Sequence, residues 1–144
     1  MADIHTLPTH LTLEIVTPDK ALVRETVDEV QVPAAEGYLG ILPGHTPLLA
    51  TLQVGQLTYR SGQQTTVLHV AFGFVEVLPD RVTVLAQVAE RPEDIDVERA
   101  EAAKRRAEER MTHPTSALDF DRARVAMMKS LIRLQVAQRV RMRG

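Results

Sequence analysis

The sequence of 144 residues contains no cysteine and no tryptophan, and it has only three phenylalanines and two tyrosines. Without cysteine the chain forms no disulfide, no thiolate metal site and no cysteine nucleophile. So few aromatic side chains argue against a stacking surface for nucleic-acid bases. No apolar run approaches a membrane span, and residues 1–10 lack the basic and apolar regions of a signal peptide. With 44% hydrophobic and 25% charged residues, the composition is that of a globular protein.

Motifs of catalysis are also missing. The chain contains no G-x-x-x-x-G-K-[ST], no G-x-S-x-G and no H-E-x-x-H. We therefore expect no enzymatic activity. His45 and His69 could in principle belong to a metal site inside a β-sandwich, but no H-x-H pair with an acidic ligand accompanies them. A loop histidine and a strand histidine are the simpler interpretation, and we predict no metal site.

The net charge of −2 conceals an uneven distribution. Residues 1–90 contain four Lys or Arg and ten Asp or Glu, whereas residues 91–144 contain thirteen basic and nine acidic residues. The last 23 residues hold seven basic side chains and no acidic one: Arg122, Arg124, Lys129, Arg133, Arg139, Arg141 and Arg143. We expect this segment to bind an acidic surface.

The first 90 residues have the pattern of short strands. Leu11, Leu13 and Ile15 alternate with polar residues, and Gly- or Pro-containing turns recur along the segment. This pattern predicts an antiparallel β-sandwich or barrel. Residues 70–78 and 81–88 are almost continuously apolar, so we expect both faces of these strands to be covered.

After Arg91-Pro92 the composition changes to Ala, Glu and Arg, which predicts a domain boundary after residue 90 and two helices in residues 91–144. Asp96 is the expected N-cap of the first helix, which carries a narrow stripe of alanines. Asp119 is the expected cap of a second helix beginning at Phe120. Together these helices would form a hairpin.

The second helix has two apolar stripes on roughly opposite faces. One consists of Phe120, Ala123, Met127, Leu131 and Leu134, and the other of Val125, Met128, Ile132, Val136 and Val140. A two-helix hairpin buries only one of them. The other needs the sandwich, another subunit, or both in alternation.

Two further features leave alternatives open. Basic residues recur along one edge of each helix: Arg99, Arg106 and Arg110 on the first, and Arg122, Lys129 and Arg133 on the second. The edges could converge into a phosphate site, although charged edges that simply flank a helix interface are the simpler interpretation. The loop of residues 36–49 presents Tyr38, Leu39 and Ile41 between glycines and prolines, and it could dock a partner or fold under the sandwich.

Four segments of the chain resemble a known family. They are L-x-L-x-I-V-T-P-D at 11–19, E-G-Y-L-G-I-L-P-G-H-T-P-L-L at 36–49, G-F-V-E-V-L-P-D-R-V-T-V-L-A at 73–86, and D-I-D-V-E-R-A-E-A-A-K-R-R-A-E at 94–108. In this order they resemble the epsilon subunit of F-type ATP synthases, which is equivalent to the mitochondrial delta subunit. The resemblance implies a ten-stranded antiparallel β-sandwich in residues 1–90, binding the gamma subunit and the c-ring, followed by a regulatory α-helical hairpin in residues 91–144.

The resemblance also implies a role. The protein would be a non-catalytic central-stalk subunit of a proton-translocating ATP synthase, which couples c-ring rotation to ATP synthesis and inhibits ATP hydrolysis through its C-terminal helices. Its partners would be the gamma subunit, the c-ring and the catalytic alpha and beta subunits, at the cytoplasmic face of a bacterial inner membrane or, alternatively, at a plastid thylakoid. A hypothesis from another class is a free-standing β-sandwich that binds a small ligand and dimerises through its helices.

Site residues follow from the same resemblance. Together with the apolar loop, it implies c-ring contacts at Tyr38, Leu39 and His45. Because the strand over residues 70–78 is apolar on both faces, we expect gamma contacts at Phe72, Phe74, Val75 and Val77. The second apolar stripe and the basic tail predict an inhibitory helix surface at Arg122, Val125, Met128, Ile132 and Val136. No cofactor is required, but ATP is a candidate regulatory ligand, bound by Glu90, Asp96, Arg99, Ala100, Arg106, Lys129 and Arg133. Lys129 departs from the arginine that ATP-binding members often have, and it offers a point charge in place of a planar fork.

Overall fold

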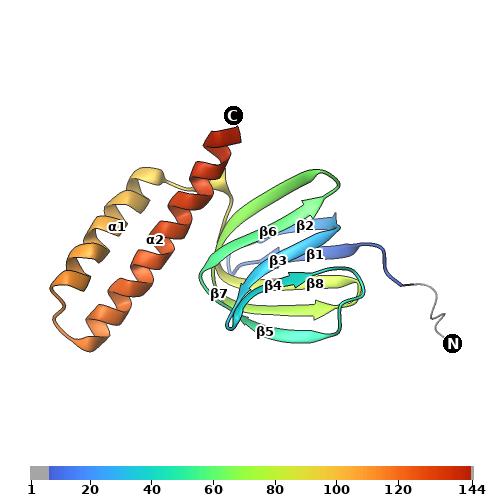
Figure 1. Cartoon of the computed structure of the whole chain (residues 1–144), viewed down its shortest axis with the longest axis horizontal. Helices are drawn as coiled ribbons and strands as arrows, with labels where there is room; N and C mark the ends of the chain where they lie inside the picture. Colours follow the sequence, from blue (N-terminus) through green and yellow to red (C-terminus); the bar gives the residue numbers. More distant parts are fainter. Residues whose placement is uncertain (1–6, 144) are drawn as a thin grey trace. The chain divides into compact units, whose positions relative to one another are not determined.

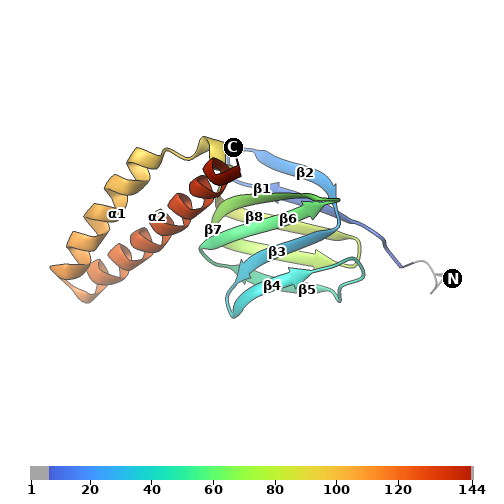
Figure 2. The same ribbon diagram turned by 45° about the horizontal axis from the view of Figure 1, so that its top comes forward.

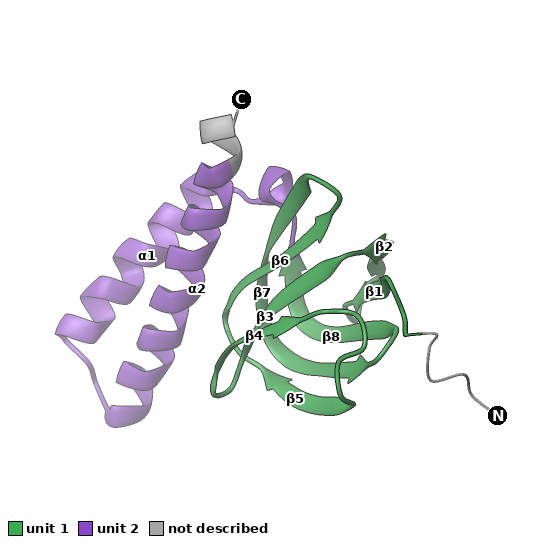
Figure 3. Cartoon of the chain, turned by 45° about the vertical axis from the view of Figure 1, so that its right-hand side comes forward, with its two compact units in different colours: residues 1–89 green, residues 90–144 purple. Residues whose placement is uncertain are grey.

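The structure, a computed structural model, describes residues 7–143, apart from the side chains of residues 140–143. The chain divides into two compact units, residues 1–89 and residues 90–144 (Figure 3). The division therefore falls one residue before the boundary expected from the change in composition. Each unit has its own architecture.

Unit 1 consists of eight strands in its described part. They are β1 (Leu11–Val16), β2 (Ala21–Val27), β3 (Glu29–Ala34), β4 (Gly37–Ile41), β5 (Leu48–Leu52), β6 (Gly55–Ser61), β7 (Gln64–Leu78) and β8 (Arg81–Glu90) (Figure 1). The strand order is β2-β1-β8-β7-β5-β3-β4, and β6 pairs with β3 and β7. The β-sandwich is confirmed, but β1 and β8 pair in parallel, so the arrangement is not antiparallel throughout.

A bend in β7 accounts for part of the difference between eight strands and the ten that the resemblance implied. Residues 64–70 pair with β6 and residues 73–77 pair with β5, so one continuous strand has two sets of neighbours. The bend lies at Phe72 and Gly73, whose φ angles are 61° and 129°. A Cβ atom on Gly73 would lie 1.9 Å from the carbonyl oxygen of Leu85, so only glycine fits this crossing.

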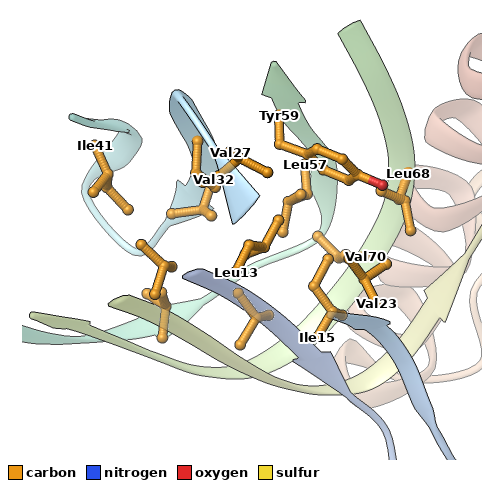
Figure 4. Close-up of a cluster of buried hydrophobic side chains, with 14 of the residues drawn as sticks. Leu13, Ile15, Val23, Val27, Val32, Ile41, Leu57, Tyr59, Leu68 and Val70 are labelled. Carbon is orange, nitrogen blue, oxygen red and sulfur yellow. The ribbon is translucent and has the colours of Figure 1, made fainter. Parts of the chain in front are cut away.

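The core of unit 1 lies between the curved layers of strands (Figure 4). Leu13 and Ile15 from β1 meet Leu57 from β6 and Leu68 and Val70 from β7, and all five side chains are completely buried. Alternate residues of β1 are buried, as its two-residue periodicity predicted, and β6 shows the same alternation. The core therefore belongs to the sandwich itself.

The expectation that residues 70–78 and 81–88 are covered on both faces is wrong for β7 after residue 71 and for β8 as a whole. Residues 67–71 of β7 are all buried, but after the bend only alternate residues are. Phe74 is 54% exposed and Leu85, on β8, is 52% exposed. The continuously buried part of β7 ends at the bend at residues 72–73. Beyond the bend the strand is still apolar in sequence, but one of its two faces is open.

Unit 2 contains a short 3-10 helix, η1 (Pro92–Asp94), and two α-helices, α1 (Val97–Thr112) and α2 (Ala117–Arg143). The α-helices run antiparallel beside each other, in the predicted hairpin (Figures 1 and 2). Asp96 is the N-cap of α1, as predicted, and its carboxylate accepts a hydrogen bond from the Arg99 N–H at 3.1 Å. Ala100 and Ala107 are buried in the alanine stripe, which lets α2 approach closely.

The predicted start of the second helix is wrong by three residues, because α2 begins at Ala117 and not at Phe120. The hydroxyl of Ser116 accepts a hydrogen bond from the Asp119 N–H at 3.0 Å, and the Asp119 carboxylate accepts one from the Thr115 N–H at 3.3 Å. This reciprocal arrangement resembles a capping box with Ser116 in the cap position. Asp119 therefore lies inside the first turn of α2.

Candidate functional site

The turn of the hairpin is fixed by an ion pair between its two helices. Arg110, in the last turn of α1, donates to the Asp119 carboxylate with an N–O distance of 2.7 Å. This hydrogen bond, together with the one from the Thr115 N–H, lowers the pKa of Asp119 below its usual value. Arg110 was expected on the basic edge of α1, and in the structure it holds the turn together.

A second ion pair joins the beginning of unit 2 to α2. Arg133 donates from Nε to Oε1 of Glu90 at 2.8 Å and from Nη2 to Oε2 at 3.1 Å. The two side chains are only 22% and 21% exposed. Both residues were predicted to bind nucleotide, and the structure brings them together as partners of each other.

The other predicted nucleotide residues lie on the same two helices. Asp96, Arg99 and Ala100 are at the start of α1, where Asp96 caps the helix and Ala100 is fully buried. Ala100 can therefore offer close packing but no exposed side chain. Arg99 and Arg106 are exposed, and Lys129 on α2 is half-buried. These basic groups thus lie on the two helices of the hairpin, and Arg133 is already bound to Glu90.

Two of the three predicted c-ring residues, Tyr38 and Leu39, line an apolar hollow at one edge of unit 1, and His45 is not part of its lining. Tyr38 on β4 is 55% exposed, and its hydroxyl accepts a hydrogen bond from the Gln56 N–H at 3.1 Å. Leu39 and His45 are half-buried. A hollow of about 380 Å³ is lined by residues 34–39 and 48–51, and β4 and β5 border this edge of the unit (Figure 2). Leu49, 70% exposed in this lining, was not selected from the sequence, although it belongs to the same apolar loop motif.

The predicted gamma surface needs a correction. Val75 and Val77 are completely buried in the core of the sandwich, so their side chains are not part of any surface. Phe72 is half-buried at the bend, and Phe74 points outward with 54% of its surface exposed. Phe74 and Leu85 help to line a second hollow of about 350 Å³. Leu85 was missed because the sequence did not show that this face of β8 is open.

The predicted inhibitory surface of α2 is only partly accessible. Arg122 and Met128 are exposed, and Val125 and Ile132 are half-buried. Val136 is completely buried, so in this conformation its side chain cannot contact a partner. The side chain of Val140 lies outside the described residues. Leu131, from the other predicted stripe, is 39% exposed, so the two stripes do not divide into one buried and one open face.

The described part of the chain holds no candidate metal site and no helix suited to crossing a membrane. No three His, Asp or Glu side chains among the described residues gather into a possible metal site. His69 is buried in β7, and His45 is a loop residue whose Nδ1 lies 2.6 Å from the Thr46 carbonyl oxygen. None of the described helices combines the length and the hydrophobicity needed to cross a bilayer.

Fold and sites together define a two-unit protein: a β-sandwich with open apolar hollows, followed by a basic helical hairpin. Residues 10–92 match the model of the beta-sandwich domain of the ATP synthase delta/epsilon chain, and residues 93–138 match the model of its long alpha-helix domain. The chain therefore belongs to the ATP synthase delta/epsilon family.

Similar proteins agree with this assignment. The ATP synthase epsilon chain of Solibacter usitatus is 50% identical over 133 residues, which cover 92% of this chain and 99% of the relative. That of Syntrophobacter fumaroxidans is 47% identical over 127 residues, covering 88% and 95%. A chain in the OSCP/F1/c-ring structure of Euglena gracilis mitochondrial ATP synthase has a TM-score of 0.72 at 20% identity, covering 99% of this chain and 86% of that one. At this identity the match shows a shared fold.

Proposed function

We propose that this protein is a non-catalytic central-stalk subunit of a proton-translocating F-type ATP synthase, which couples c-ring rotation to ATP synthesis and inhibits ATP hydrolysis through its C-terminal helices. The observation that carries the proposal is the continuous match of both units, in order, to the delta/epsilon family over residues 10–138. The protein would be a peripheral part of the complex, on the cytoplasmic face of a bacterial inner membrane.

The two hollows of unit 1 support separate contacts in this proposal. We assign the hollow lined by Tyr38 and Leu39, together with the loop residue His45, to the c-ring, because semi-rigid apolar loops are suited to docking. The surface around Phe74 and Leu85 is assigned to the gamma subunit, because an exposed aromatic beside an apolar hollow is typical of an interface anchor. Val75 and Val77 support this surface from within the core.

The hairpin is the proposed inhibitory element. Its exposed and half-buried positions on α2, Arg122, Val125, Met128 and Ile132, would contact the catalytic alpha and beta subunits when the hairpin extends. Exposed charges are screened over about 8 Å at physiological salt, so the basic groups would steer docking while the apolar side chains supply most of the affinity. ATP remains a proposed regulatory ligand, with Glu90, Asp96, Arg99, Ala100, Arg106, Lys129 and Arg133 as its candidate site.

The inhibition can be tested by measuring ATP hydrolysis in the complete enzyme. We compare the full-length protein with a chain truncated after Arg91 and with Ile132→Glu, which places a charge on the half-buried apolar stripe. Hydrolysis should be lowest with the full-length protein, highest with the truncated chain and intermediate with Ile132→Glu. Leu118→Glu, at an exposed position in the first turn of α2, is the matched control and should behave like the full-length protein. Equal rates for all four proteins would show that the hairpin is not inhibitory.

A further inference from the structure

The pair between Glu90 and Arg133 connects two residues that lie far apart in the sequence of the hairpin unit. Its partners lie 43 residues apart in the sequence, and two parallel hydrogen bonds of 2.8 and 3.1 Å connect them. This fork-to-carboxylate geometry is the strongest and most directional form of an Arg–carboxylate contact. A contact between such distant residues forms only when the chain has folded back on itself.

The surroundings of the pair strengthen it further. About four-fifths of each side chain is covered, with exposed fractions of 21% for Glu90 and 22% for Arg133. Ion pairs on open surfaces contribute little, because water and salt screen them and the side chains lose entropy. A partly buried, bidentate pair is screened less, and removing one partner leaves the other charge poorly solvated.

The position of the pair matters because the two ends of the hairpin differ. At the turn, Arg110 and Asp119 are only nine residues apart, so their contact can persist while the helices separate about the turn. Arg133 lies far along α2 and meets Glu90, where unit 2 begins. Glu90 precedes η1 and α1 in the chain, so a movement of α2 away from the start of unit 2 must separate these two residues and break the pair.

The interface between the two helices buries little apolar surface of α1. The fully buried side chains of α1 are Ala100 and Ala107, which are small and remove little apolar surface from water. An open hollow of about 290 Å³, lined by Val97, Glu101, Leu134, Ala137 and Gln138, lies between the start of α1 and the later part of α2. A specific polar contact adds to the small apolar interface that α1 supplies.

We propose that Glu90 and Arg133 form a latch that holds the hairpin in its folded form and must be released before the hairpin can extend. The latch belongs entirely to this chain, so it needs no ligand. As a regulatory device it rests on the proposed function, in which the extended hairpin inhibits hydrolysis. A partner that extends the hairpin must first break the latch, and a phosphate group that approaches the same edge of Arg133 must compete with the Glu90 carboxylate.

The test measures the opening of the hairpin in the full-length chain, outside the ATP synthase. Because the chain has no cysteine, Glu98→Cys and Gln138→Cys introduce two label sites at exposed positions, one on each helix. The distance between the labels is followed by fluorescence energy transfer during a urea titration. The variants are Glu90→Gln, Arg133→Gln and their combination. Glu93→Gln and Arg124→Gln, exposed positions on η1 and α2, serve as controls.

Each latch variant should raise the ratio of open to folded hairpin on the order of tenfold at a fixed urea concentration. The double variant should open no more readily than either single variant, because the second substitution removes a contact that is already lost. The controls should match the unsubstituted chain. Single variants that behave like the controls, or single effects that add fully in the double variant, would overturn the latch. The readout requires no ATP synthase, so it can fail while the proposed function stands, and the hydrolysis test can fail while the latch stands.

Discussion

Arg133 connects two proposals at the scale of single residues. Its Nε and Nη2 atoms donate to Glu90, and the same edge of a guanidinium is the one that binds phosphate in a bidentate manner. Arg99 and Arg106 are exposed on α1. We therefore expect Arg99 to carry more of any nucleotide affinity than Arg133 does in the folded hairpin.

The nucleotide proposal predicts a measurable loss on removal of Arg99. Arg99→Ala should weaken ATP binding by about 1.5–3 kcal/mol, the usual range for a hydrogen bond to a charged group. Isothermal titration calorimetry measures this directly, with Arg105→Ala, another exposed arginine of α1, as the matched control.

Lys129→Arg should tighten binding, because a planar fork replaces a point charge. If neither the unsubstituted chain nor Lys129→Arg produces heat at millimolar ATP, the nucleotide site does not exist.

Residue-level features were predictable when they were local. The cap at Asp96 depends on a backbone N–H three residues away, so the sequence alone was enough to find it. The start of α2 was misplaced because Ser116 and Asp119 are both good capping residues three positions apart, and the sequence does not show which of them is in the cap position. The Glu90–Arg133 pair spans 43 residues, and no local pattern could have shown it.

At the scale of elements, β7 determines which apolar side chains remain open. The strand β1 was predictable because its apolar and polar residues alternate, and in the structure the apolar residues are the buried ones. In β7 a bend at Phe72 and Gly73 separates a segment buried on both faces from a segment buried on one. A positive φ at Phe72, a residue that rarely adopts it, has no signature in sequence. This is why Val75 and Val77 were assigned to a surface that Phe74 and Leu85 in fact form.

The corrected surface gives a prediction for gamma binding. Phe74→Asp replaces an exposed aromatic side chain with a charge that would have to be desolvated at the interface, so affinity for the gamma subunit should fall by about 2 kcal/mol, or roughly 30-fold. Surface plasmon resonance with immobilised gamma subunit measures the dissociation constant. Leu118→Asp, an exposed leucine on the hairpin, is the control and should bind normally. An unchanged dissociation constant for a correctly folded Phe74→Asp variant would refute this contact.

At the scale of the whole molecule, the two units are stabilised by different interactions. Unit 1 has a continuous core of large aliphatic side chains such as Leu13, Leu57 and Leu68, each fully buried. Each buried CH₂ group contributes about 0.8 kcal/mol. The hairpin relies on buried alanines, a few larger side chains and ion pairs at both ends, and helices with so little buried surface are marginal on their own. We therefore expect the sandwich to be the more stable of the two units.

This difference predicts that the hairpin unfolds before the sandwich on heating. Both tyrosines, Tyr38 and Tyr59, lie in unit 1, and the chain has no tryptophan. The near-ultraviolet circular dichroism of tyrosine therefore reports the sandwich, with Tyr59 only 3% exposed, while ellipticity at 222 nm mainly reports the helices. We expect the 222 nm signal to fall at a lower temperature than the tyrosine signal.

A chain truncated after Arg91 should lose the first transition and keep the tyrosine transition within a few degrees, since its core is intact. Coincident transitions in the full chain, together with an unfolded truncated chain, would show instead that the two units fold as one cooperative body.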